Sequence, residues 1–422
     1  MPGSATSSDR QLAVAISEDK NLATVYAMAR RLLGSGLTGG SIYPEIWIRD
    51  SNTFIEVALK SNNPRIFRQA LLNYVIFQGE AGDKVPFGRG SIVDLYAPTG
   101  TPGTEDWDAP YKSEHMPGIT AFKSRQESDG ESSLVSATRK YVDVTGDRSF
   151  LDEKVRGVSV RERLGLALDF VLRERLDASR GLIWNETTID WGDVSPDGSR
   201  AVKNRAVCIY SNAMAVIAIG DYLQLTASDT AESKRWNARR DELKRNIRKH
   251  LWDDKRGKFI PHLYLDSSPF PSGFNEGEIY YHGGTAVAIE AGLLSRNEAV
   301  QALQRMRENV KAAGASSIGM TIYPPYPSSV YKSQEPYTYQ DGGDWCWFGG
   351  RMVQQLVRLG MVEDAYREIA PMVTRVVKAG DFHEWWTRDN QPRGSAAFKG
   401  SAGVLGKAIE MLQAWAARTL SA

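Results

Sequence analysis

The sequence predicts an all-α protein in which paired helices close into an (α/α)6 barrel. Three observations lead to this prediction. Apolar residues recur at helical spacing through most of the chain. Twelve such segments can be delimited, while strand patterns are few, with 257–265 as a candidate hairpin arm. Finally, a polar segment rich in carboxylates precedes every second helix. Twelve helices with this alternation can form six hairpins in two concentric rings.

The expected helices differ in how much of their surface is apolar. We expect them at 19–34, 48–60, 64–78, 130–145, 159–176, 206–226, 230–252, 284–294, 296–313, 345–359, 361–378 and 399–418. Segments 160–176 and 363–377 are amphipathic, which is typical of helices with one exposed face. Segments 211–223 and 283–294 are apolar on nearly all sides, which indicates buried helices. A closed inner ring would provide that burial.

The segments before the even-numbered helices carry carboxylates, and most also carry aromatic residues or glycines. They span 46–51, 125–132, 184–196, 275–284, 339–347 and 382–400. The loops before most odd-numbered helices, such as 295–297, are short and plain. If the even-numbered helices form the inner ring, they all run in one direction and their N-termini meet at one end. The polar segments would then converge on one funnel.

Composition excludes several classes of protein. The chain has 422 residues, a formal net charge of +1 and 24% charged residues, so there is no electrostatic case for binding nucleic acid or an anionic membrane. No apolar run is long enough to span a bilayer. Two cysteines, Cys208 and Cys346, are interpreted as small buried hydrophobic residues. The five histidines show no metal-binding spacing, so we expect neither a metal nor a cofactor.

No linker or low-complexity run divides the chain. We therefore expect residues 1–18 to be an N-terminal extension and 19–422 to form one catalytic domain. Residues 1–9 are polar and lack the apolar segment of a signal peptide. This predicts a cytoplasmic protein as the chain is written, or an exported one from which a signal peptide has been removed. The sequence does not predict an oligomeric state.

Carboxylates that converge on one funnel indicate acid–base chemistry or a cation site. A calcium site would concentrate Asp and Asn oxygens in one loop. Here the acids are spread over six loops, most of which also carry an aromatic residue. Because a sugar offers apolar C–H faces and many hydroxyls, this pattern favours glycoside hydrolysis, in which two carboxylates flank the bond that is cleaved.

Two segments could supply the catalytic carboxylates. Glu384 stands among aromatic residues in 382–386 (FHEWW) and is poorly placed for a salt bridge, so we interpret it as a base that activates water, with a solvated loop acid as the alternative. Segment 186–196 (ETTIDWGDVSP) offers Glu186, Asp190 and Asp193. One of these could be a turn former or helix cap, and one of them could act as the acid that protonates a leaving oxygen.

Other residues of these segments are candidate sugar ligands. Arg49 and Asp50 form a charged pair that could either brace a helix or bind adjacent hydroxyls through charge-assisted hydrogen bonds. Gln126 and Asp129 allow the same two interpretations. The further candidates for the walls and polar groups of the funnel are Trp47, Glu186, Trp191, Tyr281, His282, Asp341, Asp344, Trp345, Trp347 and Trp385.

Taken in order from about Trp47 to Ile409, these segments resemble those of the six-hairpin inverting glycosidases. This group includes glucoamylases, trehalases, neutral invertases, processing α-glucosidases and mannosylglycerate hydrolases. Segment 47–50 (WIRD) is similar to the W-x-R-D segment of glucoamylases and invertases, and 126–130 (QESDG) to Q-x-D-G with one residue added. Segment 191–196 (WGDVSP) is similar to the D-x-S-P acid segment of processing α-glucosidases.

The resemblance implies roles for individual residues. It points to Asp193 as the acid. Asp190 and Glu186 stay in contention, because segment 186–196, which would supply the acid, matches two family patterns only imperfectly. Segment 384–386 (EWW) is similar to E-x-Y, which implies that Glu384 is the base; a tryptophan stands where tyrosine is commoner. By the same resemblance, Asp50 would hold hydroxyls of the sugar being cleaved.

We therefore expect an inverting, exo-acting hydrolase of a short α-linked glucoside or related glycoside. The inverting stereochemistry follows from the resemblance. One alternative is a sugar epimerase or isomerase on the same barrel, which would need histidines in the funnel, where only His282 and His383 are candidates. The other is a carbohydrate-binding protein without catalytic activity.

Overall fold

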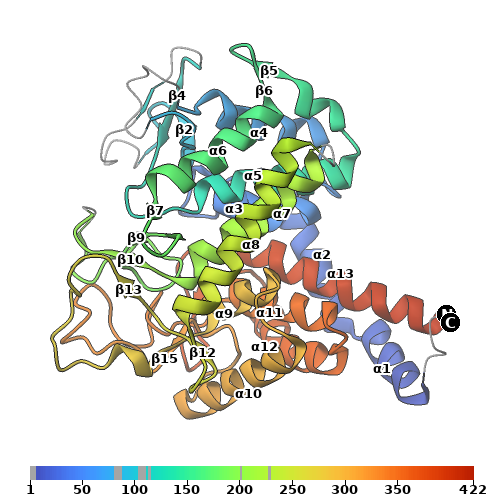
Figure 1. The fold of residues 1–422 in the computed structure, drawn as a ribbon. Helices are drawn as coiled ribbons and strands as arrows, with labels where there is room; N and C mark the ends of the chain where they lie inside the picture. Colours follow the sequence, from blue (N-terminus) through green and yellow to red (C-terminus); the bar gives the residue numbers. More distant parts are fainter. Residues whose placement is uncertain (1–5, 80–87, 103–110, 113–115, 200–201, 227–229) are drawn as a thin grey trace.

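The computed structural model describes residues 6–422 except 80–87, 103–110, 113–115, 200–201 and 227–229. Its helices form two rings (Figure 1). The inner ring consists of α3 (Ile48–Ala58), α5 (Gly130–Thr145), α7 (Ile209–Leu225), α9 (His282–Glu290), α11 (Cys346–Arg358) and α13 (Lys399–Ser421). Each of these helices contacts the next, and α13 contacts α3, so the ring is closed. The predicted (α/α)6 barrel is confirmed.

The outer ring consists of the helices that alternate with these along the chain. They are α2 (Lys20–Leu33), α4 (Pro64–Ile76), α6 (Val160–Glu174), α8 (Ala231–Leu251), α10 (Arg296–Ala313) and α12 (Val362–Ala379). The barrel core is formed mainly by aliphatic and aromatic side chains between the rings, and both cysteines are buried, as expected. Of the helices described, none is long and apolar enough to cross a membrane.

Helix α1 (Ser7–Glu18) lies within the segment that we expected to be an extension. It begins with a capping box between Thr6 and Asp9. Ala13 and Ile16 are fully buried, and the helix packs on α13 (Figure 1). The first helix of the described chain therefore packs against the inner ring.

The helix N-termini of the two rings differ. Outer-ring helices other than α12 have a side-chain cap, such as the capping box of Ser159 and Glu162 at α6. Within the described ranges, no inner-ring helix has one. Because the first turn of a helix has unpaired N–H groups and a positive dipole end, these inner N-termini favour carboxylates from other parts of the chain.

Short antiparallel strands occupy the segments between helices. The largest sheet has the order β1-β2-β4-β3, formed by Ile46–Trp47, Leu95–Pro98, Ile119–Phe122 and Tyr111–Lys112, with Ile46 opposite Tyr96. A second sheet has the order β13-β10-β9, formed by Leu263–Tyr264, Arg205–Val207 and Asn185–Glu186. These sheets place Trp47 directly before α3 and Glu186 at the start of the predicted acid loop.

The remaining strands form two-stranded sheets. They pair β5 (Lys154–Val155) with β6 (Val158–Ser159), β7 (Leu176–Asp177) with β8 (Leu182–Ile183), β11 (Trp252–Asp253) with β12 (Lys258–Phe259), β14 (Tyr280–Tyr281) with β15 (Ile322–Tyr323), and β16 (Trp385–Trp386) with β17 (Pro392–Arg393). The candidate hairpin arm 257–265 therefore contributes two strands, β12 and β13, to different sheets. In the described part of the chain, 3-10 helices lie at Arg148–Asp152 and Glu276–Glu278.

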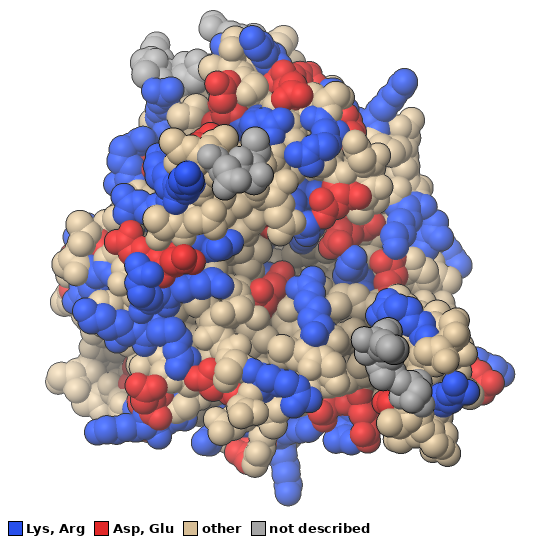
Figure 2. All heavy atoms as spheres, turned by 45° about the vertical axis from the view of Figure 1, so that its right-hand side comes forward, with Lys and Arg blue, Asp and Glu red and all other residues tan. Residues whose placement is uncertain are grey.

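Charges of both signs are interspersed on the surface. Figure 2 shows lysine and arginine side chains alternating with aspartate and glutamate over one face of the molecule. This mixture agrees with the formal net charge of +1.

Candidate active site

One pocket lies where the segments before four inner helices, α3, α7, α11 and α13, meet. Its lining consists of Tyr43, Trp47, Arg49, Asp50, Trp191, Asp193, Tyr339, Gln340, Trp345, Trp347, Glu384 and Phe398. We call it the funnel pocket. It brings together eight residues predicted from the sequence, namely Trp47, Arg49, Asp50, Trp191, Asp193, Trp345, Trp347 and Glu384. Segments far apart in the chain thus meet as the alternation of plain and polar loops predicts.

Glu384 is buried in this pocket, directly before β16, and its side chain accepts hydrogen bonds from the residues around it. The Tyr43 hydroxyl donates to Oε1 over 2.9 Å, and the Ser395 backbone N–H donates to Oε2 over 2.9 Å. Burial raises the pKa of Glu384, while these donors oppose the rise because they favour the ionised form. The arrangement fixes the carboxylate and lets it accept a proton.

Gly394 makes the close approach to Glu384 possible. Its backbone has a φ of 68°, and a Cβ at this position would lie 2.3 Å from Oε2 of Glu384. A side chain would therefore meet both the strain of a left-handed conformation and a collision with the carboxylate.

Asp193 is the exposed carboxylate of the funnel pocket. The side-chain amide of Gln340 donates to its Oδ1 over 3.1 Å. Gln340 in turn packs against Gly192, where a Cβ would lie 1.7 Å from the amide oxygen. After burial, the charge of Asp193 is among the causes that raise the pKa of Glu384, so the two carboxylates lie within electrostatic reach of each other.

Arg49 is held by the segment QESDG from the start of α5. Its Nε and Nη2 each donate over 2.7 Å to the carboxylate of Asp129, and Nη2 also contacts Glu127. Asp129 accepts a further hydrogen bond from Tyr210 over 3.0 Å. This bidentate geometry orients the guanidinium in the wall of the funnel pocket.

Several polar atoms in the pocket wall are buried without a partner in the described part of the chain. They are Asp50 Oδ1, Trp47 Nε1, Trp347 Nε1 and Gln340 Oε1. Burial raises the pKa of Asp50 to about 7. A buried polar group without a hydrogen bond costs roughly 1–3 kcal/mol, so this wall favours a ligand with many hydrogen-bonding groups.

The rest of the wall is aromatic. The ring of Trp191 lies 5.2 Å from that of Trp345 and 6.1 Å from that of Trp347, measured between centroids and edge-on in both cases. The indole N–H of Trp345 donates to the carbonyl of Tyr339 over 2.8 Å. Such rigid rings provide apolar surfaces of the kind that pack against sugar C–H groups.

The structure does not bring Asp190 or Glu186 to the pocket wall. Asp190 is fully buried, accepts a hydrogen bond from the backbone N–H of Gly284 at the start of α9, and has a pKa raised by burial to about 7. Glu186 is buried and accepts from the backbone N–H of Lys203 over 2.7 Å and of Asn204 over 3.1 Å. Both carboxylates bind backbone groups of neighbouring segments.

Other predicted ligands also brace the loops behind the pocket. Gln126 donates to the carbonyl of Ser199 over 2.7 Å. Asp341 accepts from the Tyr326 backbone over 2.8 Å, and Asp344 pairs with Arg375 over 2.8 Å. These three side chains, like Asp129, lie behind the wall.

The aromatic candidates Tyr281 and Trp385 and the histidine His282 also lie outside the pocket lining. Tyr281 bonds to the hydroxyl of Tyr326 over 2.8 Å, and His282 contacts Asn309 over 3.1 Å. Trp385 packs against Tyr339 with centroids 6.3 Å apart. These three side chains contact residues of neighbouring segments.

Four lining residues were not predicted: Tyr43, Tyr339, Gln340 and Phe398. Tyr339, Gln340 and Phe398 lie inside predicted funnel segments, where the mixture of aromatic and polar residues was a usable signal. Tyr43 precedes the first of these segments and has no motif around it. Across the described ranges, no group of three or more His, Cys, Asp or Glu residues is placed to hold a metal ion.

Comparison with known proteins gives a family match over most of the chain. Residues 39–344 match the model of the catalytic domain of the glycosyl hydrolase 94 superfamily. A search of curated proteins finds no match.

Solved structures share the fold at low sequence identity. The mannosylglycerate hydrolase of glycoside hydrolase family 63 from Thermus thermophilus, in complex with glucose, aligns with a TM-score of 0.65 and 15% identity over 91% of this chain and 99% of its own. The family 78 rhamnosidase of a Bacillus species aligns with a TM-score of 0.59 and 17% identity over 92% of this chain and 35% of its own. The rhamnosidase of Klebsiella oxytoca, with rhamnose bound, aligns with a TM-score of 0.60 and 12% identity over 92% of this chain and 63% of its own.

Proposed function

This chain belongs to the glycosyl hydrolase 94 superfamily and is a six-hairpin glycosidase, and from that premise we propose that its funnel pocket hydrolyses a short α-linked glucoside or related glycoside from one end, with inversion. The observation that carries the proposal is the meeting of two carboxylates, Asp193 and Glu384, in a pocket with aromatic walls and unpartnered polar atoms. Inverting glycosidases place an acid and a base on either side of the bond that is cleaved.

In the proposed reaction, Asp193 donates its proton to the glycosidic oxygen as the bond from that oxygen to the anomeric carbon breaks. Glu384 removes a proton from a water molecule, whose oxygen bonds to the anomeric carbon on the opposite face. The products are a sugar of inverted configuration and a free alcohol. Asp193 ends deprotonated and Glu384 protonated, and exchange with solvent restores both.

The surroundings of each carboxylate support these roles. Hydrogen bonds from Tyr43 and Ser395 favour the ionised Glu384 that a base requires. Asp193 is exposed, which leaves room beside it for a departing alcohol. We place Asp50 and Arg49 against hydroxyls of the sugar, because Asp50 Oδ1 is buried without a partner in the described chain and Arg49 is already oriented by Asp129.

The histidines do not favour an epimerase. Neither His282 nor His383 contributes to the described lining of the funnel pocket. His282 is buried behind it against Ile318 and Asn309, and burial lowers its pKa to about 4. His383 packs against Trp386 with centroids 5.5 Å apart.

Anomer-resolved proton NMR tests the proposal. A panel of α-linked disaccharides, glucosylglycerate and mannosylglycerate is incubated with wild type, Asp193→Asn, Glu384→Gln and the control Glu363→Gln, whose side chain is exposed on α12. The expected result is release of the inverted anomer by wild type and control, with a loss of at least about 100-fold in both pocket variants. Release of the retained anomer, or full activity of Glu384→Gln, would overturn the assignment.

A further inference from the structure

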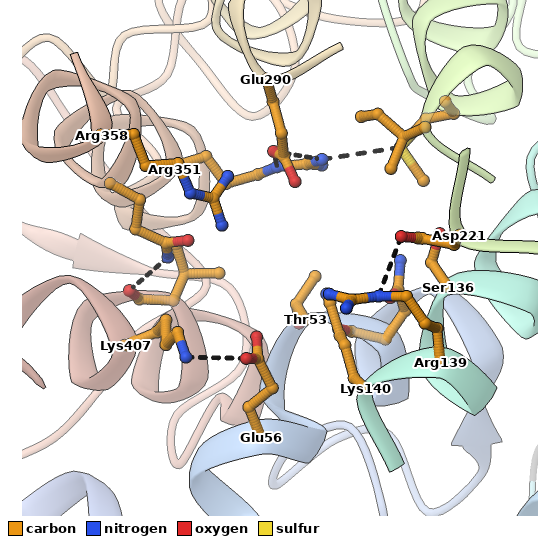
Figure 3. Close-up of a pocket in the computed structure, with 15 residues that line it drawn as sticks. Thr53, Glu56, Ser136, Arg139, Lys140, Asp221, Glu290, Arg351, Arg358 and Lys407 are labelled. Carbon is orange, nitrogen blue, oxygen red and sulfur yellow. Dashed lines mark hydrogen bonds and ion pairs between the residues drawn. The ribbon is translucent and has the colours of Figure 1, made fainter. Parts of the chain in front are cut away.

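A second cavity, distinct from the funnel pocket, lies among the inner helices. It has a volume of about 230 Å³, and all six inner-ring helices contribute to its lining, so it lies on the axis of the barrel. We call it the axial cavity; it shares no lining residue with the funnel pocket. Its charged residues are Glu56 of α3, Arg139 and Lys140 of α5, Asp221 of α7, Glu290 of α9, Arg351 and Arg358 of α11, and Lys407 of α13 (Figure 3).

Each carboxylate of the axial cavity has a cationic partner. Lys407 lies 2.7 Å from Glu56, and Arg351 lies 2.9 Å from Glu290. Arg139 pairs with Asp221 over 2.9 Å. Three of the five cationic side chains are thereby matched.

The other two cations, Lys140 and Arg358, form no ion pair with a carboxylate among the described residues, although the charges of Glu56 and Glu290 lie within electrostatic reach of both. Lys140 donates to the backbone carbonyl of Asn52 over 2.6 Å and to its side-chain oxygen over 3.0 Å. Arg358, which is an exposed residue, donates to Gln355 over 2.9 Å. Burial lowers the pKa of Lys140, and the nearby carboxylates of Glu56 and Glu290 offset this effect only in part. The cavity therefore holds an excess of two positive charges.

The helix dipole explains only part of this excess. Cations near the last turn of a helix are stabilised by its negative end. Arg358 is the last residue of α11 and can serve this purpose. Lys140 lies more than one turn before Thr145, the last residue of α5, where the effect has largely faded.

We propose that the axial cavity binds a small dianion with oxygen acceptors, such as phosphate or a dicarboxylate. Such an ion would accept hydrogen bonds from Lys140 and Arg358 and would balance the excess charge. A cation would be repelled, and an apolar ligand would find few apolar groups, chiefly Met214, Ile217 and Val404. Because α5 and α11 face each other across the inner ring, the bound ion would also link opposite sides of the barrel.

Isothermal titration calorimetry with inorganic phosphate, and separately with succinate, tests the proposal on the full chain. Wild type is compared with the double variant Lys140→Gln/Arg358→Gln. The matched control Lys311→Gln/Arg367→Gln removes two exposed charges from the outer ring. The expected result is one site in wild type and control, weakened at least about tenfold in the axial variant, together with a rise in Tm on addition of the ligand that the axial variant lacks. The two titrants distinguish phosphate from carboxylate ligands.

A third variant separates the axial cavity from the funnel pocket. Arg49→Gln removes the cationic side chain of the funnel pocket and should bind the titrant like wild type. Circular dichroism establishes that each variant is folded. The proposal is overturned if folded wild type binds neither titrant, if the axial variant binds as wild type does, or if binding is lost in Arg49→Gln alone.

Discussion

The hydroxyl of Tyr43 donates a hydrogen bond of 2.9 Å to Oε1 of Glu384, joining residues 341 positions apart in the chain. The contact connects the segment before the first inner helix, α3, to the segment before the last, α13. The inner ring closes between these two helices. Closure of the barrel therefore completes the surroundings of the proposed base.

Tyr43→Phe should reduce kcat and move the acidic limb of the pH–rate profile to higher pH. A hydrogen bond to the carboxylate favours its ionised form, so removing the donor raises the pKa of Glu384 and less of the base is ionised at low pH. We expect kcat to fall about tenfold, in line with the loss of one hydrogen bond to a charged group. Steady-state rates measured across pH give both quantities.

Tyr366→Phe is the matched control, because the Tyr366 hydroxyl donates to Asp19 over 2.8 Å outside the pocket. It should leave the profile unchanged. A Tyr43→Phe profile identical to that of wild type would show that this hydrogen bond does not influence the base.

Gly394→Ala should strongly reduce activity and should also lower the stability of the protein. Its φ of 68° would cost about 1–2 kcal/mol for any other residue, and the new Cβ would lie 2.3 Å from Oε2 of Glu384. Gly380→Ala provides the comparison, since Gly380 has a φ of 72° with nothing within 4 Å of the added carbon. Both variants should have a lower Tm than wild type, Gly394→Ala the lower of the two because its added carbon would also lie 2.8 Å from Cβ of Glu384. Only Gly394→Ala should lose at least about 100-fold in kcat/KM. Equal activity of the two variants would contradict the proposed position of Glu384.

The helices could be predicted closely because burial imposes a pattern on contiguous residues. The expected helix 206–226 is α7 (Ile209–Leu225), and the expected helix 284–294 is α9 (His282–Glu290). Helix α1 was not predicted, although its capping box at Thr6 and Asp9 was a readable signal. Its role depends on contact with α13, at the other end of the chain.

The candidate site could be predicted only in part. Segments converging on the funnel were recognisable, but the direction of each side chain was not. Asp190 and Asp193 lie in one loop, yet Asp190 binds the start of α9 while Asp193 lines the pocket. Carboxylates that satisfy helix N-termini have the same local sequence context as those that face a substrate. Tyr43 reaches Glu384 through a tertiary contact that leaves no local pattern.

Arg49→Lys should lower kcat/KM about 10- to 100-fold, as expected when hydrogen bonds between charged groups are lost. Lysine cannot reproduce the two parallel hydrogen bonds, each 2.7 Å long, that Arg49 donates to Asp129. The control is Arg205→Lys, because Arg205 makes an equivalent pair of bonds to Asp266, at 3.0 and 2.9 Å, in an exposed position. Steady-state kinetics on a cleaved substrate distinguish them, and equal effects would place Arg49 outside the binding of the sugar.

Asp341→Asn should stabilise the protein increasingly as the pH rises from about 4 to about 8. Burial raises the pKa of Asp341 to about 8, whereas an unfolded aspartate has a pKa of about 3.9. Between these values the folded protein binds a proton that the unfolded chain has released, so this group makes wild type less stable as pH increases. Asparagine resembles the protonated side chain and does not titrate.

The difference in Tm between Asp341→Asn and wild type, measured by differential scanning calorimetry, should therefore grow by a few degrees. The shift per kcal/mol should be below the about 2–4 °C typical of domains of roughly 150–250 residues, because it falls as the chain becomes longer. The exposed control Glu363→Gln should show no such growth. Comparing the variant with wild type at each pH removes the contributions of the other titrating groups common to both. A constant difference from pH 4 to pH 8 would mean that Asp341 is ionised in the folded protein throughout this range. The negative charge on Oδ2, which is buried without a hydrogen-bond partner among the described residues, would then be stabilised by other groups.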